Sequence, residues 1–243
     1  MTKIFLTSVF FSLDGEVSMH DGQGMLAVFV RFAGCNLRCF KSTGGCDTTY
    51  SYQQKKSYSI DTVIEMVEKY SKGICKRVTI TGGEPFFQLE ALQLLVTELL
   101  KKGYYINIET NGSYVVSELS ISSWNVFPYF DPFTRICFVV DYKLPGTEME
   151  DRMKVENFSL LRETDWIKFV ISNREDYDRA KQIIKQYHTR ARIAFSPKFN
   201  SIESRTIAEW MKQDMLINVK LQNQMHKIWW PELATSADVG SEV

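Results

Sequence analysis

The sequence lacks an excess of charge and long apolar stretches. Its 29 lysines and arginines balance 29 aspartates and glutamates, so the formal net charge is zero. A neutral chain has no general electrostatic attraction to nucleic acid or to a membrane surface. No apolar run approaches the roughly 20 residues of a membrane-spanning helix. We therefore expect neither nucleic acid nor a membrane as a partner.

The sequence also lacks the marks of a secreted protein. The apolar residues 4–11 resemble the core of a signal peptide, but Asp14 and Glu16 follow at once and no small-residue cleavage site is present. Of the five cysteines, three are clustered, whereas Cys75 and Cys137 lie singly in apolar runs. This pattern does not indicate a disulfide framework. It predicts a protein of the reducing cytoplasm.

No repeat, low-complexity segment or linker divides the 243 residues. This length is ample for a sizeable core. We expect a single domain over residues 1–233. The small and polar residues 234–243 predict a frayed C-terminal tail.

Strands and helices are predicted to alternate along this domain. Apolar and β-branched runs predict strands at 4–11, 27–32, 77–81, 104–108, 136–140, 166–171, 192–195 and 216–221. Helical spacing predicts helices at 60–70, 89–100, 175–187 and 202–211, with one short helix within 113–133. Ser59 is expected to cap the first of these helices. Such alternation forms a mostly parallel sheet, and six or seven units are too few for a closed barrel. The predicted fold is an incomplete, curved α/β barrel, with an open doubly wound sheet as the alternative.

Three cysteines fall within one short loop after the apolar run 27–32. They are Cys35, Cys39 and Cys46. A closed structural zinc site takes four ligands, and a cubane iron–sulfur cluster held by protein alone takes four thiolates. Three thiolates therefore indicate a metal centre with one open position. Taken alone, the triplet leaves an iron–sulfur cluster, a zinc site and merely structural cysteines open.

Polar residues and glycines also follow the other predicted strands. In α/β barrels the loops after the strands carry the chemistry. We therefore expect these segments to share one rim with the cysteines. They lie at 82–85, 109–111, 141–143, 196–198 and 222–227.

The segment Gly82-Gly83-Glu84-Pro85 and Glu109 each have a structural interpretation as well. The first can be an ordinary strand-to-helix turn, but behind the cysteine loop its glycines would let the backbone approach a ligand closely. Glu109 can be a surface charge, although its place before an Asn-Gly turn suits a contact with a ribose.

Arg31 and His226 are further candidates for ligand binding. Arg31 ends an apolar strand, where a charge needs a fixed partner. That partner is either a ligand or a carboxylate of the protein, Glu16 or Asp47. A lone histidine such as His226 is usually structural, and only its polar neighbours favour a functional role.

With these pieces in order, the sequence resembles the 7-carboxy-7-deazaguanine synthases, a family of radical S-adenosylmethionine (SAM) enzymes. Cys35-x3-Cys39 matches the start of the Cys-x3-Cys-x2-Cys motif, although six residues separate Cys39 from Cys46. Asp47-Thr48 separates this family from most radical SAM enzymes. The resemblance runs from about Phe10 to Pro231. Its marks are Leu13-Asp14-Gly15-Glu16, Phe29-Val30-Arg31-Phe32-Ala33-Gly34-Cys35, Cys46-Asp47-Thr48-Thr49-Tyr50, Ile80-Thr81-Gly82-Gly83-Glu84-Pro85, Ile108-Glu109-Thr110-Asn111-Gly112 and Gln224-Met225-His226-Lys227.

The resemblance implies a fold, a reaction and its cofactors. The fold would be an abbreviated radical SAM barrel in a homodimer. The enzyme would be a lyase that converts 6-carboxy-5,6,7,8-tetrahydropterin to 7-carboxy-7-deazaguanine in queuosine or 7-deazaguanine biosynthesis, with loss of ammonia. It would use a [4Fe–4S] cluster, SAM and Mg²⁺, with a flavodoxin-type electron donor as partner. Two alternatives remain: an activase of a glycyl-radical enzyme, and a non-catalytic zinc or iron–sulfur binding module.

The resemblance also assigns site residues, with no catalytic side chain beyond the cluster and SAM. The cluster ligands would be Cys35, Cys39 and Cys46, and Thr48 would bind Mg²⁺. The SAM side would comprise Gly45, Cys46, Asp47, Gly83, Glu84, Glu109, Asp141, Tyr142, Lys143 and Ser196. The substrate side would comprise Leu13, Asp14, Gly15, Glu16, Arg31, Thr81 and His226. Three departures stand out: Asp14 replaces a glutamine, Gly45 replaces an aromatic residue, and Asp141-Tyr142-Lys143 replaces Ser-Pro-Lys.

Overall fold

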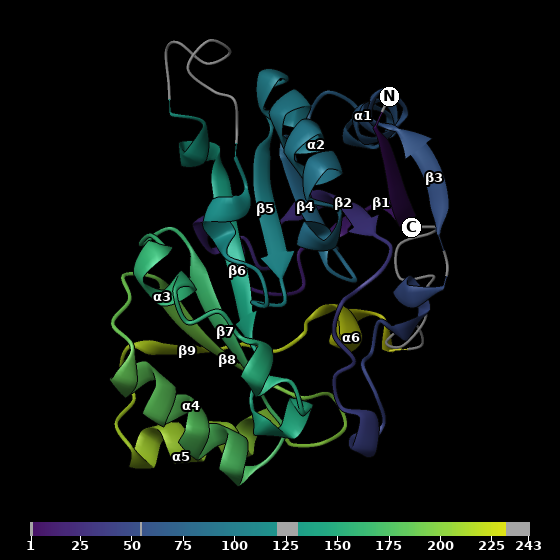
Figure 1. Cartoon of the computed structure of the whole chain (residues 1–243). Helices are drawn as coiled ribbons and strands as arrows, with labels where there is room; N and C mark the ends of the chain where they lie inside the picture. The colour runs from purple at the N-terminus through teal and green to yellow at the C-terminus, as the bar shows by residue number, and fades with distance from the viewer. Residues whose placement is uncertain (1, 54, 121–130, 232–243) are drawn as a thin grey trace.

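The computed structural model describes residues 2–53, 55–120 and 131–231 (Figure 1). The predicted frayed tail at 234–243, and part of the segment 113–133, lie outside these ranges. Within them, no helix has the length and apolar character that crossing a bilayer requires.

One nine-stranded sheet forms the centre of the molecule, in the order β3-β1-β2-β4-β5-β6-β7-β8-β9. The seven strands β2 and β4 to β9 run parallel to one another, whereas β1 is antiparallel to both β2 and β3. The strands are β1 (Lys3–Leu13), β2 (Leu26–Phe32), β3 (Lys56–Ser59), β4 (Arg77–Gly82), β5 (Tyr105–Thr110), β6 (Ile136–Tyr142), β7 (Trp166–Ile171), β8 (Arg192–Pro197) and β9 (Val219–Leu221). In the described part of the chain, the edge strands β3 and β9 do not pair with each other. The prediction of an incomplete barrel is confirmed.

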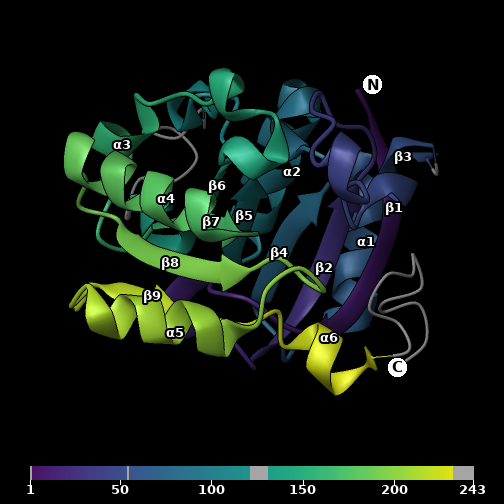
Figure 2. The ribbon, with the colours of Figure 1, turned by 90° about the horizontal axis from the view of Figure 1, so that it is seen from below.

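The helices follow the strands, and the sequence predicts the four long ones but not the short ones at 157–160 and 226–229. The helices are α1 (Ile60–Ser71), α2 (Leu89–Lys101), α3 (Asn157–Leu160), α4 (Arg174–Gln186), α5 (Ser204–Gln213) and α6 (His226–Trp229). The Ser59 side chain accepts a hydrogen bond from the Thr62 amide, so its predicted role as N-cap is confirmed. Figure 2 shows the helices spread along the curved sheet, with α1 packed on β1 and β2, α4 on β7, and α5 on β8 and β9.

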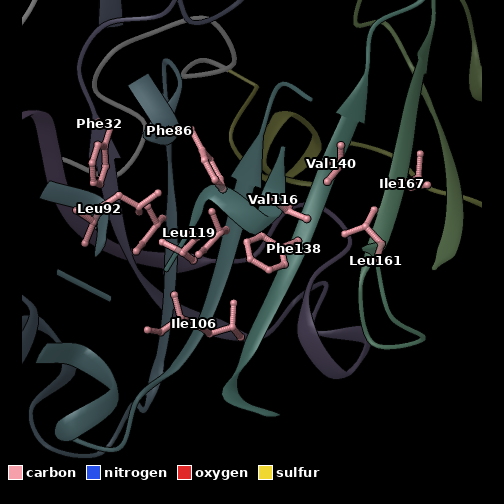
Figure 3. Close-up of a cluster of buried hydrophobic side chains, with 14 of the residues drawn as sticks. Phe32, Phe86, Leu92, Ile106, Val116, Leu119, Phe138, Val140, Leu161 and Ile167 are labelled. Atoms are coloured by element: carbon pink, nitrogen blue, oxygen red, sulfur yellow. The ribbon is translucent and has the colours of Figure 1, made fainter. Parts of the chain in front are cut away.

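Side-chain alternation along the strands separates the core from the concave face. In β5, Ile106 and Ile108 are fully buried in the main core, whereas Glu109 lines the cavity described below. Figure 3 shows Ile106 with Phe138 and Ile167 among the apolar side chains of that core. Burying each such side chain stabilises the fold by about 1.5–3 kcal/mol. The same alternation therefore builds the core and directs polar side chains into the barrel.

The segment after β9 bridges the open side of the sheet to the loop after β1. The Val17 amide donates to Gln222 Oε1 over 2.6 Å, and the Met225 amide donates to the Gly15 carbonyl over 2.8 Å. Figure 2 shows α6 beside β1, past the end of β9. Residues from both ends of the chain therefore reach one site.

Candidate active site

A cavity of about 640 Å³ opens at the carboxyl ends of the parallel strands. Residues from the loops after β1, β2, β4, β5, β6, β8 and β9 line it. Its size is in the range of small-molecule sites. The rim predicted from the sequence is thus a single cavity.

Cys35, Cys39 and Cys46 all line this cavity. All three are free cysteines. Burial raises the pKa of Cys39 to about 11, so a metal centre would have to displace its proton on binding. Three thiols facing one cavity, with a fourth position open to it, fit the donor set of a [4Fe–4S] cluster that leaves one iron free.

The six-residue spacing before Cys46 is accommodated by a loop that folds back on itself. The Gly45 amide donates to the Phe40 carbonyl over 2.8 Å, and the Ser42 amide donates to the Glu148 carboxylate over 2.9 Å. Gly44 has a φ of 95°, in the left-handed region that favours glycine. The insertion therefore loops out, and Cys46 returns to the cavity.

Most of the predicted substrate side lines the cavity. The residues that do so are Leu13, Gly15, Glu16, Arg31, Thr81 and His226. His226 packs directly against Gly15, where a larger residue would overlap its imidazole. Asp14 differs from these: it is buried and its carboxylate accepts hydrogen bonds from Thr79 Oγ1 and Ser18 Oγ. Its side chain thus ties the loop to β4 and points away from the cavity.

Arg31 is a cation held in the cavity between aromatic rings. Its guanidinium carbon lies 5.4 Å from the centre of the Phe10 ring and 5.7 Å from that of Tyr50. Its Nε is buried and has no hydrogen-bond partner among the described residues. The protein carboxylates considered as partners pair elsewhere: Glu16 with Lys168 at 2.5 Å, and Asp47 with Lys227 at 2.6 Å.

Lys168 joins the substrate side to the SAM side. Its ammonium also lies 3.6 Å from Asp141, which pairs with Lys143 at 2.8 Å. Burial alone would raise the pKa of Glu16, but the charges of Lys168 and His226 lower it to about 2. Glu16 is therefore an anion whose position is fixed.

Lys168 and Lys227 also line the cavity, although the sequence alone indicates no role for either. The available signal was a single lysine inside the apolar strand Trp166-Ile167-Lys168-Phe169-Val170-Ile171. Such a charge is seldom buried unless it is paired.

On the SAM side, six of the predicted residues line the cavity in addition to Cys46. They are Gly45, Asp47, Gly83, Glu109, Asp141 and Lys143. Glu109 accepts a hydrogen bond from Thr81 Oγ1 over 2.5 Å, and burial raises its pKa to about 7. This hydrogen bond links Glu109, which is predicted on the SAM side, to Thr81, which is predicted on the substrate side.

Glu84, Tyr142 and Ser196 do not line the cavity, so the structure does not bring them together with the other residues predicted on the SAM side. Glu84 is fully buried, and its carboxylate accepts hydrogen bonds from the amides of Phe86 and Asn111 and from Thr110 Oγ1. Tyr142 points to the other face of β6 and packs against Phe158 and Phe169 in the core. Ser196 is 1% exposed and lies outside the cavity lining.

Thr48, the predicted Mg²⁺ ligand, lines the cavity next to the third cysteine. Its hydroxyl oxygen lies 3.2 Å from Cys46 Sγ, and either atom can be the donor. The hydroxyl is therefore placed to reach both the cavity and the cysteine.

The fold and the cysteine loop define a radical SAM protein. The family model for the radical SAM superfamily matches residues 29–120, which contain the cysteine loop and β4. The fold resembles the crystal structure of QueE from Escherichia coli, with a TM-score of 0.63 at 18% sequence identity, over 91% of this chain and 93% of that one. Members of the superfamily bind a [4Fe–4S] cluster and SAM, and the three cysteines are the donor set that such a cluster takes.

Two curated relatives indicate the family within this superfamily to which the chain belongs. The chain is 38% identical over 223 residues to the 7-carboxy-7-deazaguanine synthase of Clostridium acetobutylicum, covering 91% of this chain and 93% of that protein. It is 31% identical over 245 residues to the enzyme of the same name from Leptospira interrogans, covering 94% and 96%. The chain belongs to the 7-carboxy-7-deazaguanine synthase family.

Proposed function

We propose that this protein is a lyase that converts 6-carboxy-5,6,7,8-tetrahydropterin to 7-carboxy-7-deazaguanine with loss of ammonia, in queuosine or other 7-deazaguanine biosynthesis. The name of the relatives supports the product. The observation that carries the proposal for this chain is Arg31, a half-buried cation in the cavity whose buried Nε has no hydrogen-bond partner among the described residues. A substrate carboxylate would supply that partner.

The protein's own residues bind and orient the substrate. When bound, the cluster and SAM supply the radical that takes hydrogen from C6 of the substrate. Arg31 binds the carboxylate, while the fixed anion Glu16 is available to N–H groups of the pterin. Thr81 is the register partner of Arg31 on the neighbouring strand β4, and its hydroxyl donates to Glu109 at the end of β5. Fixing both ends of a rigid heterocycle brings one carbon to the reacting position.

The direct test is an incubation of the anaerobically reconstituted protein with SAM, a reductant, Mg²⁺ and the pterin acid. We expect 7-carboxy-7-deazaguanine, identified by mass spectrometry. A full cluster that cleaves SAM without forming this product would contradict the proposal.

Arg31→Ala is expected to weaken binding of the pterin acid about ten- to a hundredfold. A hydrogen bond to a charged group contributes roughly 1.5–3 kcal/mol, and each 1.4 kcal/mol is about a factor of ten in affinity. Equilibrium binding of the pterin acid to the reconstituted protein measures the change.

Arg192→Ala is the matched control for this variant. Arg192 also stacks on an aromatic ring, with its guanidinium carbon 5.2 Å from the centre of the Trp166 ring, but it is exposed and outside the cavity. It should bind the substrate as wild type does. If Arg31→Ala folds normally and retains full affinity, this part of the cavity does not bind the carboxylate.

We also propose that Thr48 is a ligand of Mg²⁺. Mg²⁺ prefers oxygen ligands and keeps several waters, so one hydroxyl and a substrate carboxylate can form a minimal site. Thr48→Ala should weaken the dependence of turnover on Mg²⁺ while slow, uncoupled SAM cleavage continues. Turnover as a function of Mg²⁺ concentration measures this dependence.

Thr48→Ser keeps the hydroxyl and serves as the control. Because the Thr48 hydroxyl also contacts Cys46, iron content must be measured in both variants. An unchanged Mg²⁺ dependence in Thr48→Ala at full iron content would refute the assignment.

We further propose an electron-donor partner, a homodimeric state, a cellular compartment and a single-domain organisation. The family resemblance supports a flavodoxin-type electron donor and a homodimer. The five free cysteines support a reducing compartment such as the cytoplasm. The single sheet supports the prediction of one domain.

A further inference from the structure

Asn111 is a buried polar residue to which the proposed reaction gives no role. It directly follows β5, is 7% exposed and lines the cavity beside the cysteine loop. Its amide side chain could face either way, so its hydrogen bonds decide which atom points toward the cysteines.

Three side chains form a closed ring of hydrogen bonds that fixes the Asn111 amide. Asn111 Nδ2 donates to Asn36 Oδ1 over 3.0 Å, Asn36 Nδ2 donates to Ser113 Oγ over 2.8 Å, and Ser113 Oγ donates to Asn111 Oδ1 over 2.6 Å. The Ser113 backbone amide also donates to Asn111 Oδ1, over 3.0 Å. A backbone N–H can only donate, so the oxygen of Asn111 must face Ser113 and its nitrogen must face away.

The ring leaves one N–H of Asn111 Nδ2 unused, and that donor lies 3.6 Å from Cys35 Sγ. The backbone of Asn111 is fixed as well, because its amide donates to Glu84 Oε2 over 2.6 Å. Glu84 is itself held by the Phe86 amide and by Thr110. The donor is therefore directed at the first cysteine by a buried network with little freedom to turn.

We propose that Asn111 is a positioning residue that donates a hydrogen bond to the Cys35 thiolate of the bound cluster and raises its reduction potential. Reduction adds negative charge to the cluster and its thiolates, and a hydrogen-bond donor stabilises the more negative state. Hydrogen bonds to the sulfurs are among the factors that set cluster potentials. The inference rests on cluster binding and not on the pterin substrate, so it can fail or succeed independently of the proposed function.

The test is a redox titration of the reconstituted protein, monitored by electron paramagnetic resonance in the absence of SAM and substrate. Asn111→Leu removes the donor with little change of shape. We expect its midpoint potential to be more negative, by about a tenfold change in the reduction equilibrium, which for one electron corresponds to about 59 mV. Iron content should equal that of wild type.

Ser113→Ala is the matched control, because it opens the same ring but leaves the Asn111 amide beside Cys35. Its potential should stay close to that of wild type. An equal shift in Ser113→Ala and Asn111→Leu would show that the ring, and not the donor, sets the potential, and would overturn the proposal. So would a wild-type potential in fully loaded Asn111→Leu.

If Asn111→Leu takes up no iron, Asn111→Asp provides the test instead. It keeps the acceptor for Ser113 and places a carboxylate, which is not a donor, next to Cys35. Its potential should fall below that of wild type. An unchanged or higher potential would contradict the proposal. Failure of both Asn111 variants to take up iron, with normal uptake in Ser113→Ala, would also contradict it, because the role of Asn111 would then be structural.

Discussion

Replacing Cys35, Cys39 or Cys46 by alanine is expected to abolish both the cluster and the cleavage of SAM. All three thiols line the cavity, and two remaining thiolates cannot supply the three protein ligands that the site offers a cubane cluster. Iron analysis and the visible absorption of anaerobically reconstituted protein measure the cluster. Chromatographic detection of 5′-deoxyadenosine measures SAM cleavage, which should fall below detection in each variant.

The two other cysteines are controls for this loss. Cys137 is buried within β6, and its Sγ lies 3.1 Å from the Thr164 carbonyl. Cys75 is half-buried, and its Sγ lies 3.4 Å from the Leu26 carbonyl. Cys75→Ala and Cys137→Ala should keep full iron content and SAM cleavage. A cluster that survives in Cys46→Ala, or stable binding of one zinc ion in place of iron by the wild type, would overturn the ligand assignment.

The main features of the fold could be predicted because each element carries its own signal. Strands such as β6 and β7 are short apolar runs, and α1 begins at a serine that caps it. The edge strand β3 carries no such signal, since Lys56 and Ser57 are exposed and only its pairing with β1 defines it. The mostly parallel sheet likewise followed from the alternation of strands and helices.

The face on which a side chain lies was harder to predict at the ends of strands. Asp141 and Lys143 reach the cavity, whereas Tyr142 between them lies in the core. The resemblance to a family identifies a segment, but successive side chains of an extended segment point to opposite faces. Glu84 and Asp14 likewise belong to segments that match the family, yet their side chains point away from the cavity. Glu84 accepts a hydrogen bond from the Asn111 amide, and Asp14 accepts one from Thr79 on β4.

The ion pairs of the cavity could not be predicted, because they join parts of the chain that are far apart. Lys168 and Glu16 are 152 positions apart, and Lys227 and Asp47 are 180 apart. Nothing local in the sequence selects these pairs among the other charges. They form because the curved sheet and the segment after β9 bring both ends of the chain to one cavity.

Gly83→Val is expected to reduce SAM cleavage by at least about a hundredfold and to lower the iron content. A Cβ atom on Gly83 would overlap the carbonyl oxygen of Gly34 and lie 3.2 Å from Cys35 Cβ. The two segments are also joined by a hydrogen bond of 2.9 Å from the Glu84 amide to the Gly34 carbonyl. The close approach that the glycines allow is therefore an approach to the cysteine loop itself.

The obstacle at Gly83 is backbone, which cannot rotate away as a side chain can, so Gly34 and Cys35 would have to move. A misplacement of about 1 Å at a reacting site can cost about a hundredfold in rate. Gly44→Ala is the control: its φ of 95° makes the change strained by about 1–2 kcal/mol, but nothing lies within 4 Å of the added Cβ. That variant should lose some stability and keep its cluster. Wild-type iron content and SAM cleavage in Gly83→Val would show that the cysteine loop does not depend on its contact with the strand-to-helix turn after β4.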